Sequence, residues 1–195
     1  MTHGLISAAA EAAAGFAKNG GVRQDALAGL ERTGLPGARD EDWRFTPITS
    51  LDTDWIPAPR PAAVTQSFSI DGLDAIRIVI VDGWIDEAAS DLTKLPDGLS
   101  LTRGSAGSAH SEADRSRAFE ALNLAAAPEP FVLRAEGVVE KPVHLVHYST
   151  RSDEPKVSSP RIRVELARNA ELKIVEDHLA ADGSRDLVNL SVDLI

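Results

Sequence analysis

The densest group of potentially reactive side chains lies between residues 39 and 45. Charged residues fill five of six positions around one tryptophan, and a phenylalanine follows, in the order Arg39, Asp40, Glu41, Asp42, Trp43, Arg44 and Phe45. Paired carboxylates perform acid–base chemistry in glycoside hydrolases, where they flank the sugar at a defined separation. Adjacent residues on one turn cannot do this, and the neighbouring arginines neutralise them. We therefore predict a structural role, in which the charges orient a turn and both aromatic rings anchor it in the core.

The residues around this cluster predict how the turn is built. Asp40 is a favourable N-cap for a short helical turn. It precedes Arg44 by four positions, a spacing that allows an ion pair on a helical turn. Thr46 comes before Pro47, which favours an extended backbone and should end the turn.

Histidines are the second set of candidate ligands. His144 and His147, in the stretch VHLVHY, have a spacing typical of a metal pair on a helix. The surrounding residues predict a strand instead, and strand positions three apart face opposite sides. We therefore predict structural roles for both.

The remaining histidines have weaker local support. His178 follows Glu176 and Asp177 and could join a metal or acid–base site, but a histidine flanked by acids in a turn is more simply explained as solvated. His3 and His110 have no local partner. The sequence thus predicts no catalytic, cofactor-binding or metal-binding residue.

Composition excludes several other functions. The chain of 195 residues contains no cysteine, which rules out disulfides, thiolate catalysis and zinc or iron–sulfur sites held by its own thiolates. G-x-S-x-G, P-loop and dinucleotide-binding motifs are missing. A formal net charge of -10 disfavours binding to nucleic acid or anionic lipid.

The start of the chain is rich in alanine, but it lacks a basic leader and Glu11 interrupts its apolar stretch. We interpret it as a helix rather than a signal peptide and expect a cytoplasmic protein without a membrane span.

Helices in the first part of the chain and strands in the rest must position the charged cluster and the histidines. Residues 5 to 18 and 22 to 32 have the periodicity of amphipathic helices, and Gly34 follows where a helix commonly ends. A proline-rich stretch from residue 55 to 64 predicts an extended connector. We therefore divide the chain into a helical N-terminal region with its connector, residues 1–65, and a β-rich region, residues 66–195.

The β-rich region consists of short apolar runs separated by turn residues. Residues 103 to 114 have the composition of a flexible loop, and residues 116 to 126 predict one short helix. In RIRVELA, Ile162, Val164 and Leu166 alternate with charged residues, the period of a strand. Helices of crossover length are missing between the later runs, which argues against a doubly wound sheet and leaves a sandwich or a β-solenoid. The last run, SVDLI, is an unfinished strand pattern, so we expect the chain to be part of a longer protein.

Several motifs, in the same order, resemble the SufB/SufD family of the SUF iron–sulfur cluster assembly system. They are LPGARDEDWRFTPITSL, ALNLA, EGVVEKPVHLVHYST and PRIRVELARNAELKIVEDH, and the resemblance spans roughly residues 35 to 195. The short N-terminal segment and the lack of cysteine favour the SufD branch. The resemblance, which covers the N-terminal half of the family, implies a mainly β fold with α, in which a helical N-terminal region precedes the first coils of a right-handed parallel β-helix, an incomplete solenoid.

The resemblance also implies a function. Family members are non-catalytic scaffold subunits of the SufBCD complex, where they associate with a SufB-like subunit and a SufC-like ATPase. The positions implicated in cluster handling and ATPase docking lie in the C-terminal part of the family, so no site residue is transferred to this chain. We accordingly expect the iron–sulfur cluster to be handled by the assembled complex, with no cofactor bound by this chain.

Two other classes remain open. The chain could be a free-standing β-solenoid interaction module that associates with itself through an open strand edge. It could also be a polysaccharide-active β-helix enzyme, which would need acidic residues aligned on neighbouring coils.

Overall fold

The alanine-rich and amphipathic segments near the N-terminus form two helices in the computed structural model, which describes residues 4–15, 20–46, 48–104 and 115–195. Helix α1 spans Gly4–Gly15 and α2 spans Gly20–Thr33. Gly34 ends α2 as predicted, because its φ of 71° suits glycine and its N–H donates to the Leu30 carbonyl at 2.8 Å. The remaining predicted helix is α3, Ala118–Ala126.

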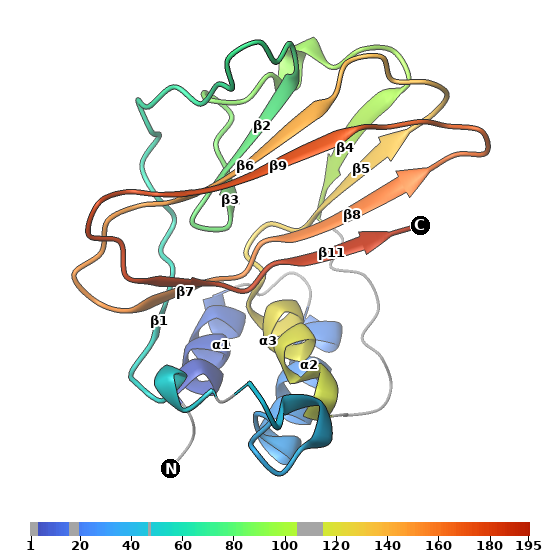
Figure 1. The fold of residues 1–195 in the computed structure, drawn as a ribbon. Helices are drawn as coiled ribbons and strands as arrows, with labels where there is room; N and C mark the ends of the chain where they lie inside the picture. The colour runs from blue at the N-terminus through green and yellow to red at the C-terminus, as the bar shows by residue number, and fades with distance from the viewer. Residues whose placement is uncertain (1–3, 16–19, 47, 105–114) are drawn as a thin grey trace.

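The three helices lie together on one side of the molecule (Figure 1). Their apolar faces share one core cluster, which includes Leu5, Leu30 and Leu122. Val157 and Leu187 from the nearest strands also pack into this cluster. Short 3₁₀ turns occupy Glu41–Trp43, Thr49–Leu51, Leu92–Lys94 and Arg115–Arg117. In the described part of the chain, no helix is long and apolar enough to cross a membrane.

The β region forms three small sheets. Their strands are β1 Ile56–Pro57, β2 Ile76–Val81, β3 Trp84–Ile85, β4 Leu99–Arg103, β5 Phe131–Ala135, β6 Val143–Ser149, β7 Lys156–Ser158, β8 Arg161–Leu166, β9 Ile174–Ala180, β10 Asp186–Val188 and β11 Ser191–Leu194. The sheet orders are β1-β7-β10, β11-β8-β5-β4 and β3-β2-β6-β9. Pairing is parallel except for β2 with β3 and β4 with β5.

The sheets are built in three layers along the chain. The inner layer contains β1, β2 and β5, the middle layer β6, β7 and β8, and the outer layer β9, β10 and β11. Each middle strand pairs with its outer counterpart: Val143 with Ile174, Lys156 with Asp186 and Arg161 with Ser191, offsets of 31, 30 and 30 residues. The outer strands lie at the edges of their sheets (Figure 1).

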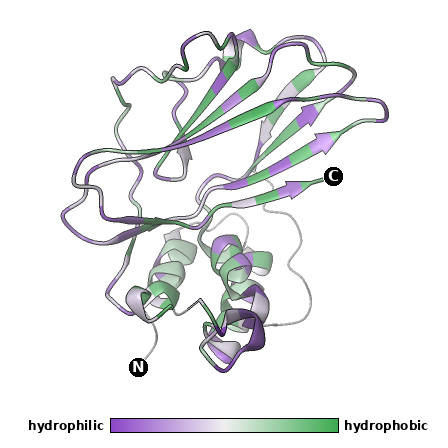
Figure 2. Cartoon of the chain, in the orientation of Figure 1, coloured by the Kyte–Doolittle hydropathy of each residue, from purple (hydrophilic) through white to green (hydrophobic). Residues whose placement is uncertain are grey.

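The main core lies between the two four-stranded sheets. Alternate residues of their strands fill it, including Ile78, Leu133, Leu145 and Ile162. Val79 and other residues of the opposite phase enter a separate small cluster. This confirms the predicted period-two patterning, which Figure 2 shows as bands of opposite hydropathy along the strands.

Two segments predicted to lack regular structure are the connector, residues 55–64, and the loop, residues 103–114. The predicted extended connector contributes β1, which pairs with β7 at the edge of its sheet, a position where a strand proline is tolerated. Most of the predicted flexible loop, residues 105–114, lies outside the described residues, as do His3, His110 and Pro47. The division of the chain at residue 65 remains a prediction.

Candidate functional site

The charged cluster of residues 39–45 contains a single 3₁₀ turn, Glu41–Trp43. Asp40 occupies the N-cap position, but its side chain makes no hydrogen bond to the turn that follows. Its Oδ2 instead accepts the Gly37 N–H at 2.7 Å, and its Oδ1 lies 3.6 Å from the Arg115 guanidinium. The predicted pairing with Arg44 is therefore wrong, because Asp40 turns back toward the preceding loop and toward the segment before α3.

Trp43 is only half-buried, so the prediction that it lies in the core is wrong, but it does anchor the turn against a helix. Trp43 stacks on Phe119 of α3 with ring centroids 5.2 Å apart and an interplanar angle of 26°. Phe45 is 87% exposed, so the prediction that it is buried is wrong. In a turn with three residues per revolution, positions two apart project from different sides, and one side alone meets α3.

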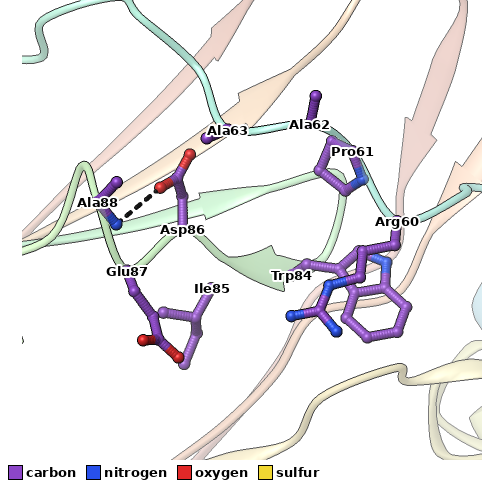
Figure 3. A pocket seen from close by; sticks show the side chains of 9 residues that line it. All are labelled: Arg60, Pro61, Ala62, Ala63, Trp84, Ile85, Asp86, Glu87 and Ala88. Atoms are coloured by element: carbon purple, nitrogen blue, oxygen red, sulfur yellow. Dashed lines mark hydrogen bonds between the residues drawn. The ribbon is translucent and has the colours of Figure 1, made fainter.

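A second group of charged residues surrounds a shallow pocket of about 370 Å³ between residues 60–63 and 84–88 (Figure 3). Its most buried acid is Asp86. The two carboxylate oxygens accept backbone N–H groups of Ala88, Ala89 and Val64 at 3.0, 3.1 and 2.9 Å. These bonds use three of the roughly four acceptor sites of a carboxylate, so Asp86 organises the loop.

A buried ion pair connects β7 to the turn that follows β2. The Lys156 ammonium of β7 is 2.7 Å from the Asp82 carboxylate, and both side chains are 2% exposed. The Thr150 hydroxyl donates to Asp82 at 2.5 Å and accepts from Lys156 at 2.7 Å. Asp82 and Gly83 form the turn between β2 and β3, and both have positive φ angles.

The two histidines of β6 are both buried, at 3% exposure, in the predicted strand. His147 shares its phase with Leu145, which belongs to the main core, whereas His144 is of the opposite phase. His144 Nε2 forms a hydrogen bond with Asp177 Oδ2 at 2.9 Å.

Strand β9 brings two further polar side chains next to His147. His178 is its direct partner in the parallel register, and the two rings stack with centroids 4.7 Å apart. Glu176 Oε1 lies 2.9 Å from His147 Nε2 and 3.3 Å from His178 Nε2. The interpretation of His178 as a turn residue is therefore wrong, since it lies within a strand and contacts a buried histidine.

The three side chains have ligand atoms within 4.8 Å of one another. Burial lowers the pKa of His147 to about 4, with a smaller contribution in the same direction from His178, while Glu176 acts in the opposite direction. His147 is therefore a neutral imidazole at neutral pH. Both of its ring nitrogens are buried without a hydrogen-bond partner, because Glu176 approaches Nε2 outside hydrogen-bonding geometry. This arrangement brings two imidazoles and one carboxylate close together.

Local sequence could not reveal this cluster. The spacing of His147 from the other two residues reflects the 31-residue offset between β6 and β9, and nothing in the pattern of either strand specifies its partner. The sequence contains a weaker signal. Two strand patterns each contain a histidine and another polar residue two positions away, which places both on the same face of the strand.

Comparisons with known proteins give two relatives. The chain is 25% identical over 172 residues to an iron–sulfur cluster assembly SufBD family protein of Synechocystis, a match that covers 80% of this chain and 38% of that protein. It is 26% identical over 168 residues to the iron–sulfur cluster assembly protein SufD of Escherichia coli, covering 83% of this chain and 40% of the other. No protein-family model matches.

These matches confirm the resemblance drawn from the motifs. Over about four fifths of its length the chain is similar to SufB/SufD family proteins, and it spans about 40% of the length of the curated relatives that it matches.

Proposed function

We propose that the chain takes part in iron–sulfur cluster assembly as a non-catalytic scaffold subunit of the SufD type, in the cytoplasm. The observation that carries this proposal is the similarity to a SufBD family protein and to SufD over 80% and 83% of the chain. The partners are a SufB-like subunit and a SufC-like ATPase, and the cluster is handled by their complex.

The fold proposed for this scaffold is a right-handed parallel β-helix. Its support is the layered pairing, in which three consecutive middle strands each pair in parallel with a strand 30 or 31 residues later. Such repetition is typical of a chain that winds around one core, here the cluster between the two four-stranded sheets.

A non-catalytic role agrees with what the best-defined acids do. Asp86 accepts three backbone hydrogen bonds, and Asp82 is neutralised by Lys156. Groups held in this way stabilise turns and layers of the fold. They also offer little to a polysaccharide-active enzyme, which requires paired acids facing a sugar.

The surface proposed for partner binding is the edge formed by the outer strands. An open strand edge exposes backbone N–H and C=O groups that can pair with another chain. Apolar side chains accompany them here: Leu179, Val192 and Leu194 are all exposed. We expect this edge of the 195-residue chain to support self-association or docking of the SufB-like subunit, whereas ATPase docking belongs to the part of the family that this chain does not match.

Sedimentation velocity tests the proposal. The chain is measured alone, with a SufB-like subunit, and with a SufC-like ATPase. We expect co-sedimentation with the SufB-like subunit and none with the ATPase alone, and we expect Val192→Lys to weaken the former. A chain that self-associates but ignores the SufB-like subunit would instead support the free-standing interaction module. A monomer in every mixture would refute both.

A further inference from the structure

We propose that His147, Glu176 and His178 form a binding site for a divalent transition-metal cation. The proposal does not depend on a role in cluster assembly, and it departs from the sequence-based expectation that no residue of the chain ligates a metal. It rests on the spacing of the ligand atoms, the burial of the His147 ring without hydrogen-bond partners and the contrast with a neighbouring histidine on the same strand.

The spacing matches a shared ion. Nitrogen and oxygen ligands lie about 2.0–2.2 Å from zinc. Two such ligands around one ion are therefore about 2.8–3.6 Å apart for bond angles between a right angle and the tetrahedral angle. Glu176 Oε1 lies 2.9 Å from His147 Nε2 and 3.3 Å from His178 Nε2. Both separations fall within this interval.

His147 supplies a fixed ligand that lacks a partner. Its side chain is 3% exposed and shares the phase of Leu145 in the main core, so the ring has little freedom. Neither ring nitrogen makes a hydrogen bond, although Glu176 is close to Nε2. A buried polar atom of this kind normally has a partner. A metal ion at Nε2 would provide one and would also hold the Glu176 carboxylate nearby.

The two ligands on β9 can adjust to the ion. The His147 and His178 rings are nearly parallel, at 11°, so their in-plane lone pairs do not yet converge. The His178 side chain is 53% exposed and has space to rotate about its side-chain bonds. Its exposure also leaves solvent access on that side, where water can complete the coordination.

The ligand set selects the class of metal. Calcium and magnesium favour oxygen ligands, whereas two imidazoles with one carboxylate suit zinc, iron, cobalt or nickel. His144 shows the difference within the same strand. It is equally buried and lies at the same 2.9 Å from a carboxylate of β9, but Asp177 completes its hydrogen bond, and its register partners are Arg77 and Val175 instead of a histidine.

The test is a metal titration of the 195-residue chain after treatment with a chelator. Isothermal titration calorimetry with Zn²⁺ is expected to show one saturable site, and Co²⁺ is expected to give visible absorption bands of a nitrogen–oxygen site. Histidine ¹⁵N NMR should place the largest Zn²⁺-induced shift on His147 Nε2. Fe²⁺, added without oxygen, is expected to compete for the same site.

Variants distinguish a specific set of metal ligands from non-specific binding of the cation to a charged surface. Loss of a residue that only hydrogen-bonds to a metal ligand lowers metal affinity about 10–100-fold. Loss of a ligand itself should therefore lower the affinity at least about tenfold. Glu176→Gln and His178→Gln are the main variants, because both side chains are partly exposed and their replacement should leave the fold intact. His144→Gln is the matched control and should bind normally. Absence of saturable binding, or equal losses in His144→Gln and His178→Gln, would overturn the proposal.

Discussion

Removing the ammonium of the buried ion pair should destabilise the fold strongly. Lys156→Met keeps a long side chain in the same space but leaves the Asp82 carboxylate without its cation. Both partners are 2% exposed and their charged atoms are 2.7 Å apart. The carboxylate would keep only the Thr150 N–H and hydroxyl, at 3.0 and 2.5 Å.

The magnitude follows from the cost of an uncompensated buried charge. Breaking a buried pair by removing one partner costs about 3–5 kcal/mol, whereas replacing both partners together is often nearly neutral. Asp82→Asn should therefore also be costly, because it leaves the Lys156 charge buried. Backbone strain should not contribute to the effect of Asp82→Asn. Asp82 has a φ of 50°, and asparagine adopts that conformation as readily as aspartate.

A double-mutant cycle in urea, followed by far-UV circular dichroism, measures the coupling. We expect Asp82→Asn with Lys156→Met to cost clearly less than the sum of the two single changes, by about 2 kcal/mol or more. Single losses below about 1 kcal/mol, or strict additivity, would mean that the pair is solvated and that its burial has been overstated.

Three further predictions concern stability in the same assay. Trp43→Ala should cost about 2 kcal/mol through the lost stack on Phe119, while Phe45→Ala should stay within about 0.5 kcal/mol, and equal losses would contradict the assignment of a single anchor. Asn123→Ala should cost about 2 kcal/mol, because the fully buried amide donates to the carbonyls of Pro160 and Asn189 at 2.8 and 2.6 Å; a loss below about 0.5 kcal/mol would refute this. Burial alone would raise the pKa of Asp91, but the Arg77 N–H and the charges of Lys94 and Arg77 hold it below 3.8. Its stabilisation is thus complete above the unfolded-state pKa and is lost as the pH falls through the folded value, so Asp91→Asn should cost about 1 kcal/mol at pH 7 and progressively less in acid. A deficit that does not change with pH would contradict this origin.

Local patterns were sufficient wherever one face of an element meets one core. The predicted alternation of Ile162 and Val164 puts both side chains in the main core, and the periodicity of residues 5 to 18 agrees with the buried face of α1, which includes Leu5 and Ala9. In both cases the period of hydrophobicity is a direct result of burial on one side.

Contacts between distant layers could not be foreseen in this way. Lys156 and Asp82 are 74 positions apart, and their pairing depends on how β7 passes the turn after β2. His147 and His178 meet through a register between strands that are equally compatible with other partners. The exposure of Phe45 was unforeseen for a related reason. Whether a ring at this position is covered depends on where α3 lies, and the local sequence does not specify that.

The layered pairing also bears on how the protein loses its order. Every backbone hydrogen bond between layers joins a strand to the one directly before or after it in the stack, so cooperativity is passed from neighbour to neighbour. The middle layer is held on both sides and the outer layer on one. Opening of β9, β10 and β11 therefore disrupts a single set of ladders, while opening of β6, β7 and β8 disrupts two. Within the 195-residue chain, local stability therefore differs between the layers, and fraying should be greatest in the layer that contains Glu176 and His178.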